Sequence, residues 1–475
     1  MAVQPEADDS LDTRAEEDRA RGSTHVTSLY QQLQPSPKGL SRDEVAADQR
    51  RRLHGAMVEA VAANGYAGTS VDQIVGLAGV STKALYRHFG SKQECFLATY
   101  DHVVAEGAAR IATAYGMGSC EGENWSAGLL LAFDAFVEEI VARPKEARLA
   151  LVEVLAAGPA VLERVQQSQL LFEDMIAQSL RHAHDGIELP SVLVEGIVHG
   201  IWHVARVLVM ESRPESMRGL GAELLDWLLC YVSPTAEALS PSIARNGGVS
   251  ATTETFGPEA RTAVANQVAG PQHRTIGDHA DPRMRALRAA TRVAALEGYA
   301  ALSLVRIARE AEVDLDALFE MFDDVEQCFL AALGLASAQL LARALEAAGS
   351  QPCKGSVGFA SALERSLAAI LDEIAKDPSL AQVTFVEVLH TGPSGARQRT
   401  TLLRRFADLV RRQAPISSRP SPLVADAIVG AIWGVIHDRV VRGQANTLPA
   451  LSAHVAHLAL APLGGAETAV TASSG

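Results

Sequence analysis

Cysteine is scarce in this chain of 475 residues, which contains only Cys95, Cys120, Cys230, Cys328 and Cys353. The number is odd, the spacing is wide and no Cys-x-x-Cys pair occurs, so neither a disulfide framework nor a structural zinc site is predicted. A chain of this length can bury two or more hydrophobic cores without such cross-links. We therefore expect a multidomain protein of the reducing cytoplasm that holds no metal and no cofactor.

Long apolar runs are also missing. The first residues are acidic and lack an apolar core, so they are not a secretory signal. The best candidate for a membrane span, residues 427–436, has about half of the roughly 20 apolar residues that a bilayer requires. The formal net charge of −14 argues against a chain that coats nucleic acid along its whole length, so any nucleic-acid site must be a local basic patch.

Sequence signatures of catalysis are absent as well. The chain has no glycine-rich phosphate-binding motif, no Gly-x-Ser-x-Gly and no His-Glu-x-x-His. The sequence therefore predicts a protein that is not an enzyme.

What the chain does contain is helical periodicity, with no convincing strand, so we predict an all-α fold. The segments that lose the period are rich in polar residues, glycine and proline, which is typical of tails and linkers. We divide the chain into an acidic disordered tail (1–45), a first head (46–93), a first helical domain (94–233), a linker (234–280), a second head (281–326), a second helical domain (327–464) and a flexible tail (465–475).

The first head has the sequence signature of a helix-turn-helix. Ser70, with Gln73 three residues later, predicts a capping box for the second helix. Gly79 lies where that helix should end, and Ser81 can cap the third helix. Gly65 marks the expected end of the first helix.

The second head repeats the first almost without gaps. Val80 corresponds to Val313 and Phe89 to Phe322, both 233 residues later, and Trp202 corresponds to Trp433 at an offset of 231. A register maintained over a whole domain indicates a duplication, so we expect two tandem units.

The charge of the third helix is inverted between the heads. The first copy carries Lys83, Arg87 and Lys92 with no acid, whereas the second has acids and no base: Asp314, Asp316, Glu320, Asp323 and Asp324. The predicted core positions of the second head remain apolar, at Leu318, Phe319 and Phe322. We expect the second head to be repelled by a phosphate backbone. Its acids result either from drift after duplication or from a function, which would be deliberate repulsion of DNA or a surface that faces a protein.

From Ile74 to Phe96 the chain resembles the TetR family of bacterial transcriptional regulators, whose heads end in a pattern similar to Leu85-Tyr86-Arg87-His88-Phe89 followed by Lys92. The second head resembles that family only as a degenerate relative. The resemblance implies that the third helix enters the major groove, that Lys83, Tyr86, His88 and Lys92 lie at the DNA, and that the helical domain binds a small effector and forms dimers.

The residues themselves favour the same surface. A helix that starts at Ser81 directs its first N–H groups toward a phosphate, and basic side chains follow on its exposed side. Three arginines near the predicted start of the first helix are badly placed for the helix dipole, which suggests that they face phosphate. The predicted DNA-contacting set is Arg50, Arg51, Arg52, Ser70, Ser81, Thr82, Lys83, Tyr86, Arg87, His88 and Lys92. The alternative is an ordinary solvated basic cluster.

The helical domain offers candidates for an effector site, which we predict at Phe133, Phe136, Phe172, Met175, His199, Trp202 and His203, although helically spaced aromatics are also typical of a core. Glu195, His199 and His203 recur every four residues, as metal ligands on a helix can. Because glycines flank them, a tightly packed helix explains the segment more simply, and we predict no metal site.

The sequence therefore predicts a cytoplasmic, effector-responsive transcriptional regulator, a repressor by family analogy, that reads double-stranded DNA through the first head only. Its partners would be a DNA operator and an unknown small molecule. The two halves would pair as an intramolecular pseudo-dimer, with a further homodimer as an additional option, and no membrane would be involved. The competing hypothesis is a ligand-sensing or protein-interaction module in which both heads are vestigial.

Overall fold

The computed structural model describes residues 41–118, 125–183, 189–211, 219–231, 281–349 and 355–463. Within these ranges the chain is helical and has no β-strand, which confirms the all-α prediction. The linker predicted at 234–280, the tail at 465–475 and all but the last five residues of the tail at 1–45 lie outside the described residues.

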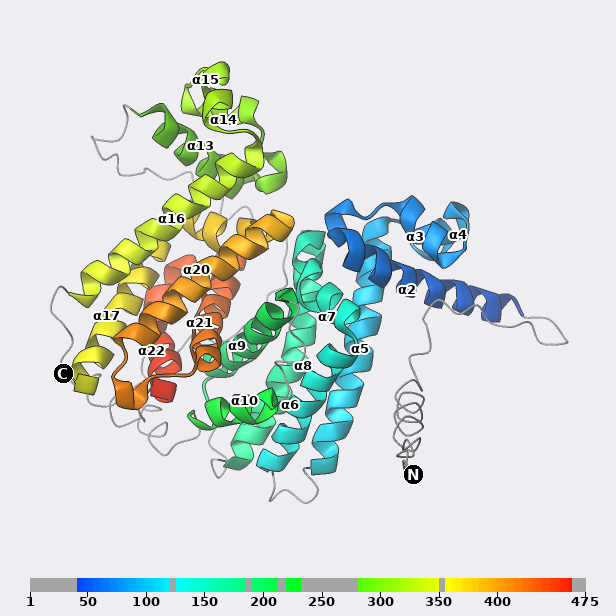
Figure 1. The fold of residues 1–475 in the computed structure, drawn as a ribbon, viewed down its shortest axis with the longest axis horizontal. Helices are drawn as coiled ribbons and strands as arrows, with labels where there is room; N and C mark the ends of the chain where they lie inside the picture. The colour runs from blue at the N-terminus through cyan, green and yellow to red at the C-terminus, as the bar shows by residue number, and fades with distance from the viewer. Residues whose placement is uncertain are drawn as a thin grey trace, which may run out of the picture. The chain divides into compact units, whose positions relative to one another are not determined.

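In both halves a head of short helices precedes longer helices (Figure 1), and the second half contains additional short helices. Residues 41–231 form α2 (Arg42–Gly68), α3 (Val71–Ala78), α4 (Thr82–His88), α5 (Lys92–Gly118), α6 (Trp125–Ala142), α7 (Pro144–Leu151), η1 (Glu153–Ala157), α8 (Pro159–Ala183), α9 (Ser191–Met210) and α10 (Leu220–Leu229). Residues 281–463 form α13 (Pro282–Glu297), η3 (Tyr299–Ala301), α14 (Leu304–Ala311), α15 (Leu315–Met321), α16 (Val325–Ala348), α17 (Gly355–Lys376), α18 (Pro378–Gln382), η4 (Val383–Glu387), α19 (Val388–His390), α20 (Gly392–Gln413), η5 (Ile416–Ser418), α21 (Pro422–Val441), η6 (Ala445–Leu451), α22 (Ser452–Leu460) and η7 (Ala461–Leu463).

The described residues form two compact units. The first contains residues up to Ala63 together with Thr69–Thr99, and the second contains Asn64–Gly68 and everything from Tyr100 onward. The first unit thus corresponds to the first head, although α2 begins at Arg42, earlier than the predicted boundary at 46. The second head and both helical domains belong to one unit.

The turns of the first head form as local chemistry dictates. The Ser70 hydroxyl accepts a hydrogen bond from Gln73 N (3.3 Å), and the Gln73 side chain accepts one from Ser70 N (2.8 Å). Gly79 has left-handed dihedral angles, φ 60° and ψ 39°, that favour glycine, and Ser81 caps α4 through Ala84 N. The predicted capping box at Ser70, the turn at Gly79 and the cap at Ser81 are confirmed. Gly65, with φ 69° and ψ 166°, interrupts the helical dihedrals near the end of α2.

The second head has the same helix cap, left-handed turn and buried ring, formed by other residues. Asp314 caps α15 by accepting from Asp316 N and Ala317 N, and Phe322 is buried. Glu312 takes the left-handed position of Gly79, with φ 53° and ψ 44°. The prediction that Phe319 belongs to the core is wrong: it is 53% exposed, because it occupies the outward position that Tyr86 occupies in α4.

A buried glutamate anchors the segment that follows the first helix of each head. The Glu153 carboxylate accepts a hydrogen bond from Tyr66 N (3.0 Å), and the Glu387 carboxylate accepts one from Tyr299 N (2.7 Å). Both tyrosines follow a glycine of positive φ, Gly65 or Gly298. The second unit therefore contains the same long-range contact twice.

Within the second unit, α9 and α21 pack along their length, so the two helical domains lie side by side. Glycines permit the close approach: a Cβ on Gly200 would lie 2.7 Å from the Ala427 carbonyl oxygen, and Gly430 and Gly434 face His203 and His199. Further contacts join the two domains, including the hydrogen bond from the Tyr231 hydroxyl to the Leu458 carbonyl (2.8 Å). These contacts give the two halves a common core.

Two of the described helices are long and apolar enough to cross a membrane by length and composition, α9 and α16. Residues 427–436, the best candidate in the sequence, do not belong to either of them. In α9 most of the apolar window is buried against neighbouring helices, as in the core helix of a globular protein, whereas the window of α16 is 39% buried.

Candidate DNA-binding head and effector cavity

The recognition surface of the first head is the outer face of α4. Thr82, Lys83 and Arg87 are exposed, and Tyr86 is 51% exposed. Ala84 and Leu85 point the other way, into the core, and Phe89 closes that core at the end of the helix. A short helix that buries one face and presents cationic and aromatic side chains on the other is the arrangement by which helix-turn-helix proteins contact base edges and phosphates.

His88 and Lys92 lie closer to the protein than the rest of the predicted set. His88 Nε2 is 3.1 Å from Gln49 Oε1, and burial, together with the charges of Arg50 and Arg87, lowers the pKa of His88. The Lys92 ammonium donates to the Thr69 carbonyl (2.9 Å), and burial lowers its pKa. Both side chains are half-buried, and Lys92 joins α5 to the start of α3.

The prediction that Arg50, Arg51 and Arg52 lie at the start of the first helix is wrong. Because α2 begins at Arg42, the arginines at 50–52 do not stand at a helix start. Arg52 is buried: its guanidinium pairs with Asp48 (2.9 Å) and donates to the Ala78 carbonyl (2.7 Å). Arg51 also pairs with Asp48, whereas Arg50 is exposed and lies over the Phe89 ring at 5.9 Å. The structure thus accounts for Arg52 by an intramolecular role, which buttresses the turn.

The second head has two arginines that contact the turn and the ring as in the first head, but the outer face of its third helix differs. Arg285 donates to the Glu312 carbonyl (3.1 Å), and Arg283 lies over the Phe322 ring at 4.7 Å, as Arg52 and Arg50 do at their own turn and ring. On α15, by contrast, the outward positions hold Asp316, Phe319 and Glu320, all of which are half-buried or exposed. No base replaces them on that helix, so its outer face is acidic.

The residues predicted to bind an effector differ in their surroundings. Phe136, Phe172 and Trp202 form a chain of edge-to-face rings, with centroids 6.4 and 6.0 Å apart. Phe133 and His203 are buried, and Met175 is half-buried. The rings stabilise the first helical domain as a core would.

His199 instead belongs to an ion-pair network between α9 and α21. Its Nε2 lies 3.4 Å from an Asp438 oxygen, and Glu195 on the same helix pairs with Arg439 (3.2 Å). Burial opposes both charged forms of the first pair, but their mutual attraction raises the pKa of His199 and holds that of Asp438 well below its usual range. Although Glu195, His199 and Asp438 are close enough to share an ion, arginine already holds the Glu195 carboxylate, so ion pairing explains the cluster. His203, which the sequence grouped with them, is not part of it.

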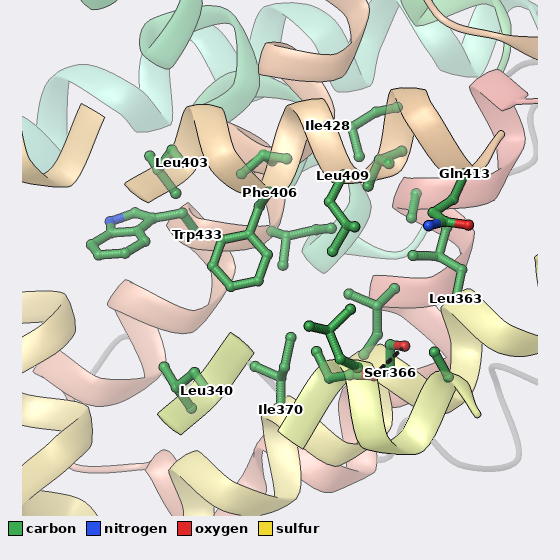
Figure 2. A pocket seen from close by; sticks show the side chains of 18 of the residues that line it. Leu340, Leu363, Ser366, Ile370, Leu403, Phe406, Leu409, Gln413, Ile428 and Trp433 are labelled. Atoms are coloured by element: carbon green, nitrogen blue, oxygen red, sulfur yellow. Dashed lines mark hydrogen bonds between the residues drawn. The ribbon is translucent and has the colours of Figure 1, made fainter. Parts of the chain in front are cut away.

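A cavity of about 210 Å³ lies in the second helical domain, where the sequence analysis placed no effector residues. Figure 2 shows Phe406 and Leu409 of α20 projecting toward Leu340 and Ile370 of α16 and α17, with Trp433 of α21 at one side. The polar groups at its wall are few: Gln413, Thr384 and Ser366, whose hydroxyl donates to the Ala344 carbonyl. Such a lining suits an apolar molecule that carries a single polar group.

The comparisons with known proteins agree with the geometry of the first head. Residues 56–99 match the family described as bacterial regulatory proteins, tetR family. No curated protein matches the chain.

Solved structures resemble part of the chain at low identity. They include the transcriptional regulator FadR of Bacillus subtilis in complex with stearoyl-CoA (17% identity, 37% of this chain and 96% of that chain, TM-score 0.34). FadR of Bacillus halodurans, a regulator of fatty acid degradation, is similar (16%, 38% and 96%, TM-score 0.34). A TetR family transcription regulator from Marinobacter aquaeolei VT8 is another (20%, 39% and 97%, TM-score 0.32).

The match at residues 56–99 covers the end of α2, the whole of α3 and α4 and the start of α5, including the exposed cationic face described above. It confirms the resemblance to the TetR family that was predicted from the sequence, for this part of the first head.

Proposed function

We propose that this protein is a cytoplasmic, effector-responsive repressor that reads DNA through its first head only. The observation that carries the proposal is the contrast between two similar helices: α4 presents Lys83 and Arg87 to solvent, while α15 presents Asp316 and Glu320. Phosphate contacts dominate the affinity of proteins for DNA, so a cationic helix is attracted and an acidic one is repelled.

The close packing of α9 against α21 supports the further proposal that the two helical domains act as the two halves of an intramolecular pseudo-dimer. One chain would then supply the common core that a dimer supplies in two chains, and only one of its two heads would face DNA. An additional homodimer would bring two reading heads together.

The test of DNA reading is selection of bound sites from random duplex DNA with the full chain, followed by titration of the selected site at several salt concentrations. We expect Lys83→Glu and Arg87→Glu each to weaken binding and to reduce the log–log salt slope by about 0.9 for every phosphate that the variant no longer neutralises. Both side chains are exposed on α4, so neither change should disturb the core.

The matched control is Asp316→Ala combined with Glu320→Ala on the second head. This variant should bind as well as the unchanged protein or better, because it removes repulsion. Loss of binding in this control, or full binding in both α4 variants, would refute the assignment to the first head. Failure of the full chain to select any site would favour the alternative of a sensor with two vestigial heads.

For the effector we propose an apolar small molecule with one polar group, bound in the cavity between α16, α17, α20 and α21. Filling the cavity with Ile370→Trp should abolish release of DNA by an effector found in a screen of apolar compounds, and leave DNA affinity intact. Val357→Trp is the control, since Val357 is exposed on the same helix, α17. Release that persists in Ile370→Trp would place the effector elsewhere, for example at the aromatic residues predicted in the first helical domain.

A further inference from the structure

A second cavity, of about 180 Å³, lies between the two helical domains and is lined mostly by arginine and small residues. Arg148 and Arg206 come from the first domain, and Arg397 and Arg399 from α20 of the second. We call this space the arginine chamber. It is separate from the apolar cavity of Figure 2, with which it shares no lining residue.

Arg399 is the most unusual of the lining residues. It is only 5% exposed, and its Nε is buried without a hydrogen-bond partner among the residues that the structure describes. Within the described ranges, its guanidinium interacts with the Trp433 ring, whose centroid lies 4.9 Å away. A guanidinium has five N–H donors, and no hydrogen bond joins this one to another of the described residues.

Arg206 on α9 adds a second cation to the same wall. The Arg206 Nε donates a hydrogen bond to the Leu151 carbonyl. Burial lowers the pKa of Arg399, and the nearby charge of Arg206 lowers it further. Two buried arginine side chains whose charges act on each other therefore line the chamber.

No carboxylate of the described residues forms an ion pair with Arg206 or Arg399. Glu153, which lines the chamber, is already paired with Arg148 (3.1 Å), and Asp438, which lies outside the lining, is paired with His199. Buried charges without a counterion cost several kcal/mol each, so proteins usually pair them. At the offsets of the sequence repeat the equivalents of Arg399 and Arg206 are Val165 and His437, so packing of the helices does not itself require two arginines.

We propose that the arginine chamber binds a small multivalent oxyanion, with phosphate or carboxylate groups held between Arg206 of α9 and Arg399 of α20. Guanidinium forks match these planar or tetrahedral groups in bidentate geometry. One buried water needs roughly 10–15 Å³, so the chamber has room for such an anion and some water, but it is smaller than the roughly 300–1,000 Å³ of pockets for larger ligands. The bound anion joins the two helical domains, and this role does not depend on DNA binding or on the apolar cavity.

The experiment is thermal unfolding of the full chain at neutral pH in titrations of inorganic phosphate and of citrate, each compared with sodium chloride at equal ionic strength. We expect at least one of the two oxyanions to raise the midpoint in a saturable way, as a ligand that binds only the folded state does. Phosphate active alone identifies a phosphate-type ligand, and citrate active alone a carboxylate-type ligand; either result supports the chamber.

Arg399→Met tests the location. Methionine keeps contact with Trp433 but has no charge, so the variant should unfold at no lower temperature without oxyanion, and its affinity for the oxyanion should fall by about tenfold or more. Arg405→Met, which removes an exposed charge from the same helix, should keep the full shift. Should Arg399→Met fail to fold, Arg399→Lys retains the charge but not the fork and should weaken the shift.

Two results would overturn the proposal. One is the absence of any oxyanion-specific shift in the unchanged protein. The other is a shift that survives in Arg399→Met, or in Arg399→Lys where that variant replaces it, because the anion would then be held elsewhere, for instance by the cationic face of α4.

Discussion

Glu312 occupies the left-handed turn of the second head that Gly79 occupies in the first. A side chain in this conformation costs on the order of 1–3 kcal/mol, because its Cβ crowds the following carbonyl group. The turn persists because the rest of the head fixes it: Val313 N donates to the Ala308 carbonyl, and Arg285 donates to the Glu312 carbonyl. The second head therefore forms the same turn with a residue that is less suited to it.

Exchanging these residues should move the local stability of each head in opposite directions. Glu312→Gly should stabilise the second head by about 1 kcal/mol after the greater freedom of glycine in the unfolded chain is subtracted, and Gly79→Ala should destabilise the first head by a similar amount. Hydrogen exchange of the full chain gives the measurement, as roughly fivefold slower exchange in α14 and α15 and roughly fivefold faster exchange in α3 and α4. Equal exchange in the changed and unchanged second heads would mean that Glu312 carries no strain.

At the scale of helices, the sequence predicted what depends on neighbouring residues and missed what depends on distant ones. The cap at Ser70 and the turn at Gly79 were predictable because their partners lie within a few residues. The role of Arg52 was not, since its partner carbonyl at Ala78 is 26 residues away. For the same reason periodicity could not reveal the apolar cavity, whose lining comes from five helices and the segments between them.

The pairing of α9 with α21 depends on glycine, and this dependence can be tested at Gly200. Gly200→Ala would gain about 1 kcal/mol of helix propensity, but its Cβ would stand 2.7 Å from the Ala427 carbonyl oxygen, a backbone atom that cannot turn aside. We expect a net destabilisation of about 1–3 kcal/mol, seen as a lower thermal midpoint of the full chain. Gly107→Ala on α5 is the control: nothing lies within 4 Å of its Cβ, so the midpoint should rise slightly. A Gly200→Ala chain as stable as the unchanged protein would show that the helices can separate without cost.

At the scale of the whole chain, a net charge of −14 must coexist with attraction to DNA. The charge is unevenly placed, because the first head shows cations on α4 while the corresponding face of the second head shows acids on α15. Binding should therefore depend on orientation, with the second head kept away from the phosphates. A chain with these two surfaces would place one reading head, not two, on each half-site.

The stoichiometry on DNA follows from that arrangement. We expect one full chain on an isolated half-site and two chains on a palindromic operator, since each half-site needs a reading head of its own. Sedimentation of the complexes with selected DNA of each kind measures the ratio, and a mixture of unchanged and Lys83→Glu chains provides the control: the charge-reversed chain should be excluded from both kinds of site. One chain that occupied a complete palindrome would show that the second head reads DNA in spite of its acids, and a single-headed regulator would then be the wrong description.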